Sequence, residues 1–303
     1  MKSPYSFKGA LEASERINWR IEDIIGGDKR LDFSRPFLPE ALARVGTLPF
    51  LSPEERRVLN QIRGHEYLSM FGLVEEFILP FVVDHARAAL GADNYRIRAL
   101  LRFAGEEAKH IHLFKRFQAE FNDGFGTECG FIGPAEDVKK FVLSHSPLGV
   151  GIAILHIEWI TLRHYIEAVR DNHDIDPQFK SLLKHHWLEE SQHTKLDTLI
   201  VDGLAEAASP AEIDQAFREY GEIRAFIDRG LQQQAELEAK SFIRATARNL
   251  SEAEKQELCG TALQGMRWTY LGTGMTHPNF LETVERIKPE ARKDIEAMAP
   301  AFC

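Results

Sequence analysis

The sequence predicts an all-α protein built around a bundle of long helices. Hydrophobic residues recur at a helical spacing through most of the chain. No convincing alternating run bounded by hairpin turns predicts a strand. Helix starts carry capping residues: Ser52, Ser209 and Ser251 are each followed three residues later by a glutamate, which is the capping-box pattern. These three observations favour an all-helical fold.

The capping residues, glycines and prolines divide the chain into successive helices. Gly133-Pro134 opens a short helical piece, and a short helix is expected in the tail. Residues between the first two long helices, up to 51, should be irregular. The main helices are expected near residues 8–25, 53–90, 93–121, 148–172, 177–204, 210–248 and 252–271.

The chain shows no break that would separate two domains. No Pro-, Gly- or Ser-rich linker and no low-complexity segment interrupts it. We therefore expect a single domain over residues 1–303. A bundle at about 53–204 would form its centre, and a helical extension at about 210–303 would follow.

Composition excludes several classes of partner. The chain has 303 residues with 46 acidic against 37 basic side chains, a net charge of −9, which argues against nucleic acid because phosphate binding needs a concentrated basic surface. Three scattered cysteines make no disulfide framework, so we expect a reducing, cytoplasmic setting. The most apolar stretch, Phe77 to Val83, is too short to span a bilayer. A membrane partner is therefore not expected.

Two helices repeat one chemical motif. Glu107 and His110, and again Glu190 and His193, are Glu-x-x-His pairs. A spacing of three puts both side chains on one face of a helix, where they can bind one metal ion. One such pair arises easily by chance. Two of them, joined by one glutamate from each of two further helices, form the ligand pattern of a di-metal carboxylate bundle.

The two further glutamates can be located by spacing and helical face. Glu158 lies 32 residues before Glu190 on an apolar face, and Glu75 lies 32 residues before Glu107. Glu76 is the alternative in the first half, but its face carries more polar residues, so we favour Glu75. Buried carboxylates and imidazoles in this number suit iron or manganese, and four carboxylates neutralise two divalent ions.

Helical position also predicts where the other polar residues near the motifs point. His186 lies four residues before Glu190 on the same face and is expected to add a nitrogen ligand to the metal held by His193. His185 is one position off and should point elsewhere. Glu106 and Glu189 should point about 100° away from the motif residues beside them. Asp197 could orient His193, but the interpretation as a solvated aspartate is favoured.

At this point the residues resemble a known family, the di-iron arylamine N-oxygenases of the p-aminobenzoate N-oxygenase type. The resemblance covers about residues 60–200 and rests on Glu75, Glu107-x-x-His110, Glu158 and His186-x-x-x-Glu190-x-x-His193. It implies a ferritin-like four-helix bundle with additional N- and C-terminal helices, two irons with a manganese–iron pair left open, and dioxygen as co-substrate. The string Glu75 to Leu79 is similar to the family's first ligand helix. Residues 1–50 and those after about 205 match nothing in the family.

The leading functional hypothesis is a non-haem di-iron oxygenase that oxidises a small organic substrate, with an amine as the substrate that the resemblance implies. Such an enzyme needs an electron donor, either a reductase or a ferredoxin, and a homodimer is compatible with this architecture. The alternatives are a ferritin-like iron-handling protein, either a ferroxidase or a storage subunit, and a desaturase or radical-generating relative. A degenerate bundle that serves only as an interaction protein is disfavoured by the intact ligand set.

Overall fold

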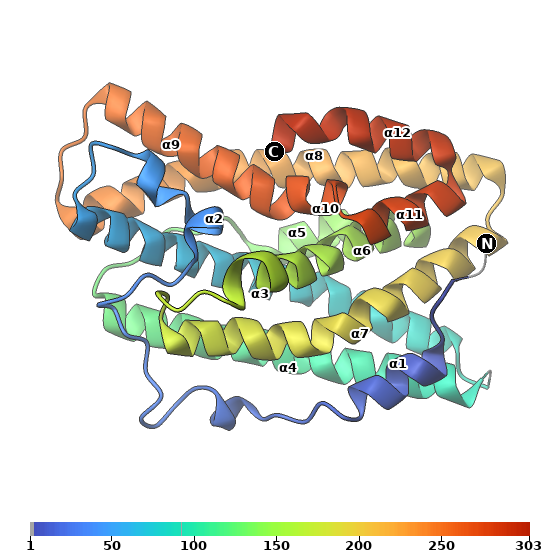
Figure 1. Cartoon of the computed structure of the whole chain (residues 1–303). Coiled ribbons are helices and arrows are strands. Elements are labelled where there is room, and N and C mark those ends of the chain that lie inside the picture. The colour runs from blue at the N-terminus through green and yellow to red at the C-terminus, as the bar shows by residue number, and fades with distance from the viewer. Residues whose placement is uncertain (1–2, 92) are drawn as a thin grey trace.

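Four long helices form the centre of the molecule. In the computed structural model, which describes residues 3–91 and 93–303, α3 lies along α4 and α6 lies along α7 (Figure 1). Further contacts between α4 and α7 join the two pairs into one bundle. The four helices span Pro53–Ala88 (α3), Asn94–Phe125 (α4), Pro147–His164 (α6) and Pro177–Ala207 (α7).

Other helices cover this bundle on two sides. On one side α8 (Pro210–Thr246) packs across α3 and α6, and α9 (Glu252–Arg267) packs on α8. On the other side the short α1 (Phe7–Ser14) packs against α4 and α7, below them in Figure 1. The short α5 (Ala135–Leu143) contacts both α3 and α6. The bundle interior is therefore shielded from solvent on both sides.

Shorter elements complete the chain. The N-terminal segment contains η1 (Ile21–Asp23), α2 (Glu40–Ala43) and η2 (Val45–Thr47). Two π-helical turns, η3 (Tyr165–Val169) and η4 (Trp268–Gly272), extend α6 and α9. The tail contains α10 (Thr273–Met275), α11 (Pro278–Ile287), α12 (Pro289–Met298) and η5 (Ala299–Phe302). Within residues 3–91 and 93–303 no strand is formed, so the all-helical prediction is confirmed.

The capping boxes and the long helices agree with expectation, while two terminal regions do not. Glu55, Glu212 and Glu254 each close the expected capping box with the preceding serine. The first helix, expected over 8–25, ends at Ser14, because the following segment leaves the helix and carries Trp19 into the core. The tail, expected to hold one short helix, contains several.

The helix α3 is buried on nearly all sides through its middle. Apolar and polar residues alike from Leu59 to Ile78, with one half-buried exception, are shielded from solvent. A helix that is buried all round must provide partners for every polar group it carries. The ionisable side chains in this stretch therefore mark places where the bundle interior is polar.

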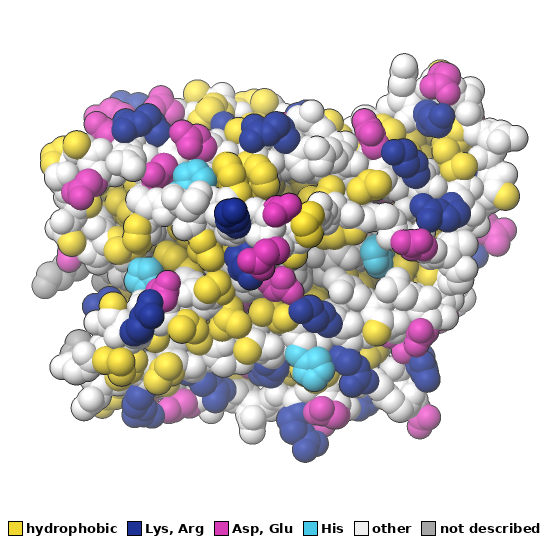
Figure 2. Space-filling view, turned by 180° about the vertical axis from the view of Figure 1, so that it is seen from behind, with side chains coloured by type: hydrophobic (Ala, Val, Ile, Leu, Met, Phe, Trp, Pro, Cys, Tyr) yellow, Lys and Arg dark blue, Asp and Glu magenta, His cyan; other side chains and the backbone are white. Residues whose placement is uncertain are grey.

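The outer surface is mixed in charge. Seen from behind, lysines, arginines and acidic residues lie side by side, and hydrophobic side chains gather between them across the middle of the view (Figure 2). No helix of the described residues combines the length and the apolar character needed to cross a membrane.

Candidate metal centre

Seven side chains expected to bind metal lie in the middle of the bundle. They come from four helices, and each is at most 3% exposed. Burying so many ionisable groups in an apolar core costs free energy unless opposite charges accompany them. The seven are Glu75 from α3, Glu107 and His110 from α4, Glu158 from α6, and His186, Glu190 and His193 from α7.

Six of these residues form two overlapping groups of donor atoms. In each group the donor atoms lie within 4.8 Å of one another. His110 and Glu190 belong to both groups, so the two groups are neighbours with common members. The first group is Glu75, His110, His186 and Glu190, and the second is Glu107, His110, Glu190 and His193.

Glu190 lies at the centre of the arrangement. Its Oε1 atom is 3.0 Å from His186 Nε2 and 3.1 Å from His110 Nδ1. The same atom lies 3.3 Å from His193 Nδ1. One carboxylate oxygen thus contacts all three imidazoles, which makes Glu190 the natural shared ligand of a two-metal site.

The alternatives within each helix are separated by position. Glu75 Oε1 lies 2.9 Å from His186 Nε2. Glu76, half-buried, turns outward and pairs with Lys115 at 2.8 Å. His185 likewise lies outside the groups, because its Nδ1 donates to the Ser181 carbonyl at 2.7 Å. The structure brings Glu75 and His186 into the centre and leaves Glu76 and His185 out of it.

Glu158 lies beside the two groups rather than within them. Burial raises the pKa of this carboxyl well above its usual range, and the neighbouring Glu190 carboxylate raises it further. The Oε2 atom of Glu158 has no hydrogen-bond partner among the described residues.

The donor set fits a pair of divalent cations. Several buried donor atoms lack a hydrogen bond of good geometry within residues 3–91 and 93–303, although opposing atoms lie close. They are Glu75 Oε2, both Glu107 oxygens, His110 Nδ1, Glu158 Oε2, Glu190 Oε1 and His193 Nδ1. Unpaired polar atoms are rare in native cores, and here several of the carboxylate oxygens lie within 4 Å of the two imidazole Nδ1 atoms. Four carboxylates would balance two divalent ions, and oxygen with imidazole nitrogen suits iron or manganese.

The pKa directions show the same need for positive charge. Burial lowers the pKa of His186, but the carboxylates of Glu190 and Glu75 outweigh it and raise that pKa to about 9. Burial of Glu107 and the charge of Glu75 beside it raise the pKa of Glu107 well above its usual value. The cluster therefore takes up cations, which protons or metal ions can supply.

Two further glutamates orient the motif histidines across the helix pair. His110 Nε2 on α4 donates to Glu189 Oε2 on α7 at 2.9 Å, and His193 Nε2 on α7 donates to Glu106 Oε2 on α4 at 3.0 Å. Both carboxylates are at most 3% exposed. As expected, Glu106 and Glu189 lie outside the two donor groups, but they are buried against the motif histidines of the neighbouring helix rather than turned to solvent. Such contacts fix which ring nitrogen faces a metal, and here Nδ1 faces inward.

The N-terminal segment covers the His110 side of the centre. The Trp19 ring stacks on the His110 imidazole, with centroids 6.2 Å apart and planes 8° apart. Lys109 Nζ lies 3.7 Å from the centroid of the same indole and also binds Glu189. The sequence pattern predicted a continuous first helix over residues 8–25, which gave no sign that Trp19 would reach the centre.

Two other sequence expectations need correction. Asp197, expected to be solvated, is 1% exposed, and neither carboxylate oxygen has a hydrogen-bond partner among the described residues. The role considered for it, orienting His193, is filled by Glu106. His186 was expected to join the metal held by His193, but the structure groups it with Glu75 and His110 instead.

A largely apolar cavity of about 230 Å³, which the exposed Asp137, Arg229 and Gln233 also line, lies next to the centre, between α3, α5, α6 and α8. Phe71 lines it, and the ring centroid of Phe71 is 5.8 Å from that of His186. Val74 and Ile157, the residues before Glu75 and Glu158, line it as well. A small apolar molecule held there would be separated from the proposed ligand His186 by the Phe71 side chain.

Comparisons with known proteins give distant likenesses. No protein-family model matches the chain, and no curated protein matches it. Among solved structures, a mutant R2-like ligand-binding oxidase with an aerobically reconstituted Mn/Fe cofactor shares 15% identity, with a TM-score of 0.49 over 88% of this chain and 93% of that chain. Another mutant of this oxidase, with an Fe/Fe cofactor, shares 16% identity, with a TM-score of 0.48 and the same coverage.

Proposed function

We propose that this chain is a non-haem oxygenase that holds two metal ions, either two irons or a manganese–iron pair. The observation that carries the proposal is the pair of buried donor groups that share His110 and Glu190. When bound in this ligand set, the metal ions would supply the activation of dioxygen for the oxidation of an organic substrate. Apolar residues would stabilise a helical core better than this many buried ionisable groups, so their presence indicates a role other than structure.

The proposed ligands form two sets, one for each metal position. His110 and His193 would each hold one ion through Nδ1, and their Nε2–H groups are fixed by Glu189 and Glu106. Glu190 is the shared carboxylate. The remaining ligands are Glu107 at the position of His193, Glu75 and His186 at the position of His110, and Glu158 as a terminal carboxylate beside Glu190.

The apolar cavity supports a small, aromatic substrate. An engineered cavity of about 150 Å³ holds benzene, so the 230 Å³ found here has room for a substituted ring. Phe71 and Phe77 supply aromatic walls. Together with the resemblance to the arylamine N-oxygenases, this favours an arylamine whose nitrogen is turned toward the metal centre.

The test is metal loading followed by oxygen incorporation. Protein loaded anaerobically with ferrous iron should hold about two ions per chain, as a two-metal bundle requires. Mixing with isotopically labelled dioxygen and a panel of anilines should give products that carry label on nitrogen, detected by mass spectrometry. Glu190→Ala is the matched inactive control.

Each other outcome has a distinct meaning. Trace metal only, after anaerobic loading, would contradict the metal centre itself. Two irons that oxidise with oxygen consumption but label no organic product would indicate an iron-handling ferroxidase instead. Label on carbon rather than nitrogen would keep the oxygenase and overturn the choice of an amine.

A further inference from the structure

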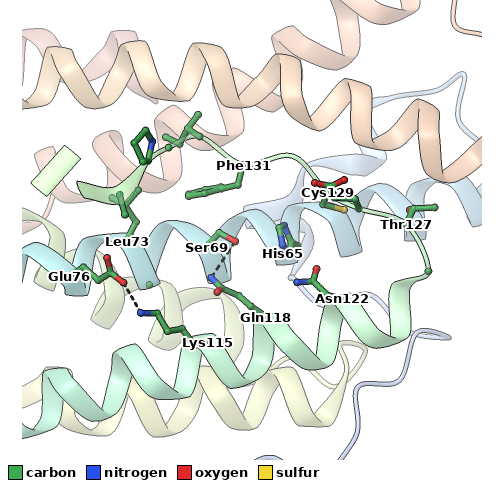
Figure 3. A pocket seen from close by; sticks show the side chains of 17 residues that line it. His65, Ser69, Leu73, Glu76, Lys115, Gln118, Asn122, Thr127, Cys129 and Phe131 are labelled. Carbon is green, nitrogen blue, oxygen red and sulfur yellow. Dashed lines mark hydrogen bonds and ion pairs between the residues drawn. The ribbon is translucent and has the colours of Figure 1, made fainter. Parts of the chain in front are cut away.

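A second, larger cavity opens to solvent on the outer side of α3 and α4. It has a volume of about 680 Å³ and lies between these two helices and the segment 126–135 (Figure 3). Its lining mixes polar and apolar residues. His65 and Ser69 reach it from α3, and Gln118 and Asn122 reach it from α4. None of the proposed metal ligands lines it.

The open cavity and the apolar cavity share a wall. Leu73, Ile132, Gly133 and Pro134 line both of them. Because the same residues line both cavities, only a single layer of residues separates the two cavities at this place. The open cavity therefore directly adjoins the apolar cavity beside the proposed metal centre.

One side of this wall is held firmly in place. The buried amide of Gln234 on α8 donates to the Gly130 carbonyl at 3.2 Å and accepts from the Ile132 N–H at 3.0 Å. Gly230 allows the close approach, because a Cβ there would lie 3.2 Å from Ile132 Cδ1. Ile132 thus has a fixed position, and Leu73 on α3 is the other large apolar side chain that lines both cavities.

The charges of the open cavity are already balanced. Lys115 is paired with Glu76 at 2.8 Å. Glu128 lies 3.7 Å from Arg244. Burial lowers the pKa of His65 to about 4, so its imidazole is neutral at pH 7. Among the described lining residues, no unpaired cation is present to hold an anionic group.

Neutral hydrogen-bonding groups remain available in this cavity. Gln118 Nε2 makes only long contacts, at 3.4 Å to the Leu68 carbonyl and 3.4 Å to Ser69 Oγ, where about 2.9 Å is usual. His65 is 6% exposed, and neither it nor Asn122 makes a hydrogen bond within residues 3–91 and 93–303. These groups offer amide and imidazole donors and acceptors to a neutral partner.

We infer that the substrate is amphipathic, with an apolar ring in the apolar cavity and an uncharged hydrogen-bonding group, such as a carboxamide, in the open cavity that adjoins it. A slender linker would cross the wall between Leu73 and Ile132. The inference rests on the proposed function for the identity of the reacting end. The polar end is recognised by Gln118, Asn122 and His65.

Three probes that carry the same aromatic amine separate the contribution of the ring to binding from that of the polar end. They are 4-butylaniline, 4-(4-aminophenyl)butanamide and 4-(4-aminophenyl)butanoate, which share the ring and the linker and differ at the far end. Binding is measured by titration calorimetry without oxygen, on protein as purified and after iron loading. The amide should bind about fivefold or more tighter than 4-butylaniline, since one added hydrogen bond gives about that factor. The affinity for the amide should also exceed the affinity for the carboxylate by about tenfold.

Variants assign the preference to the cavity. Gln118→Leu should reduce the advantage of the amide to about twofold or less and leave the affinity for 4-butylaniline unchanged. Gln232→Leu, at an exposed position on α8 where the side chain binds only Asp228, is the matched control and should change neither. Asn122→Asp, at an exposed position, should weaken binding of the carboxylate further and keep that of the amide.

The outcomes separate this inference from the proposed function. Equal affinities for amide and carboxylate, no binding of any probe, or an amide preference that survives Gln118→Leu would overturn the inference. Because binding is measured without turnover, a protein that prefers the amide but never oxidises it would support the amphipathic site and count against the oxygenase alone.

Discussion

Replacing Glu189 by glutamine changes one buried contact to the imidazole of His110. The carboxylate is fully buried and accepts the Nε2–H of His110 at 2.9 Å. Glutamine has the same shape and can still accept that proton through its amide oxygen. The variant therefore removes the charge of the partner and leaves the packing of the bundle nearly unchanged.

The size of the effect follows from the geometry. A carboxylate partner makes the His110 Nδ1 a stronger ligand, and loss of such partners weakens metal binding by about 10–100-fold. Because glutamine keeps the hydrogen bond, we expect the lower end, about tenfold or about 1.4 kcal/mol. Lys109, which also pairs with Glu189, has a side chain 23% exposed and can turn to water.

The assay is an anaerobic titration of ferrous iron against a competing chelator. Glu76→Gln is the matched control, since it also removes a lysine-paired carboxylate next in sequence to a proposed ligand, but one that is half-buried and outside the centre. Iron affinity of Glu189→Gln within twofold of the wild type would refute the orienting role of Glu189. An equal loss in Glu76→Gln would mean that the effect is not local.

Three further predictions concern the centre and its surroundings. Glu190→Ala should lose at least one of two metal ions per chain by elemental analysis, because it removes the carboxylate that contacts all three imidazoles. His186→Ala should retain most metal but alter the visible spectrum of the cobalt(II)-loaded protein, whereas His185→Ala should match the wild type; identical spectra for all three would exclude His186 as a ligand. Burial raises the pKa of Glu66 from 4.5 to about 8, so the folded state binds the extra proton in that interval. The unfolding free energy should fall as pH rises from 4.5 to 8, and Glu66→Gln should flatten this slope in urea titrations; an unchanged slope would argue against a buried proton on Glu66.

The helices and the inner donor residues could be predicted because both follow from periodicity within one helix. Capping boxes mark where α3, α8 and α9 begin. Spacings of three, four and seven residues place His186, Glu190 and His193 on one face, and the structure brings them together. The apolar faces around Glu75 and Glu158 likewise identified the carboxylates that turn inward.

The outer carboxylates could not be found from a single helix. Glu106 points away from Glu107 by the rotation of one residue, but that direction faces His193 of the neighbouring helix α7. Glu189 reaches His110 in the same reciprocal way. One signal was present in the sequence: each Glu-x-x-His motif is preceded directly by another glutamate, in both halves of the bundle.

The N-terminal segment was mispredicted for a different reason. Residues 15–25 have a composition compatible with a helix, and only tertiary contacts reveal why they leave it. Trp19 gains a stacked contact with His110 and a cation contact with Lys109. Such contacts between distant parts of the chain outweigh helix propensity, which differs by less than about 1 kcal/mol between most residues.

The two halves of the bundle are near copies in motif and spacing, but one position breaks the correspondence. His186 lies four residues before Glu190, and the equivalent position before Glu107 is Phe103. The Phe103 ring lies against His193, with centroids 4.1 Å apart. The His186 imidazole therefore lies beside one proposed metal position, and the Phe103 ring lies at the equivalent place beside the other. Two ions bound there would have different ligand fields and affinities, so loading should proceed in order, and the two ions should differ in redox potential.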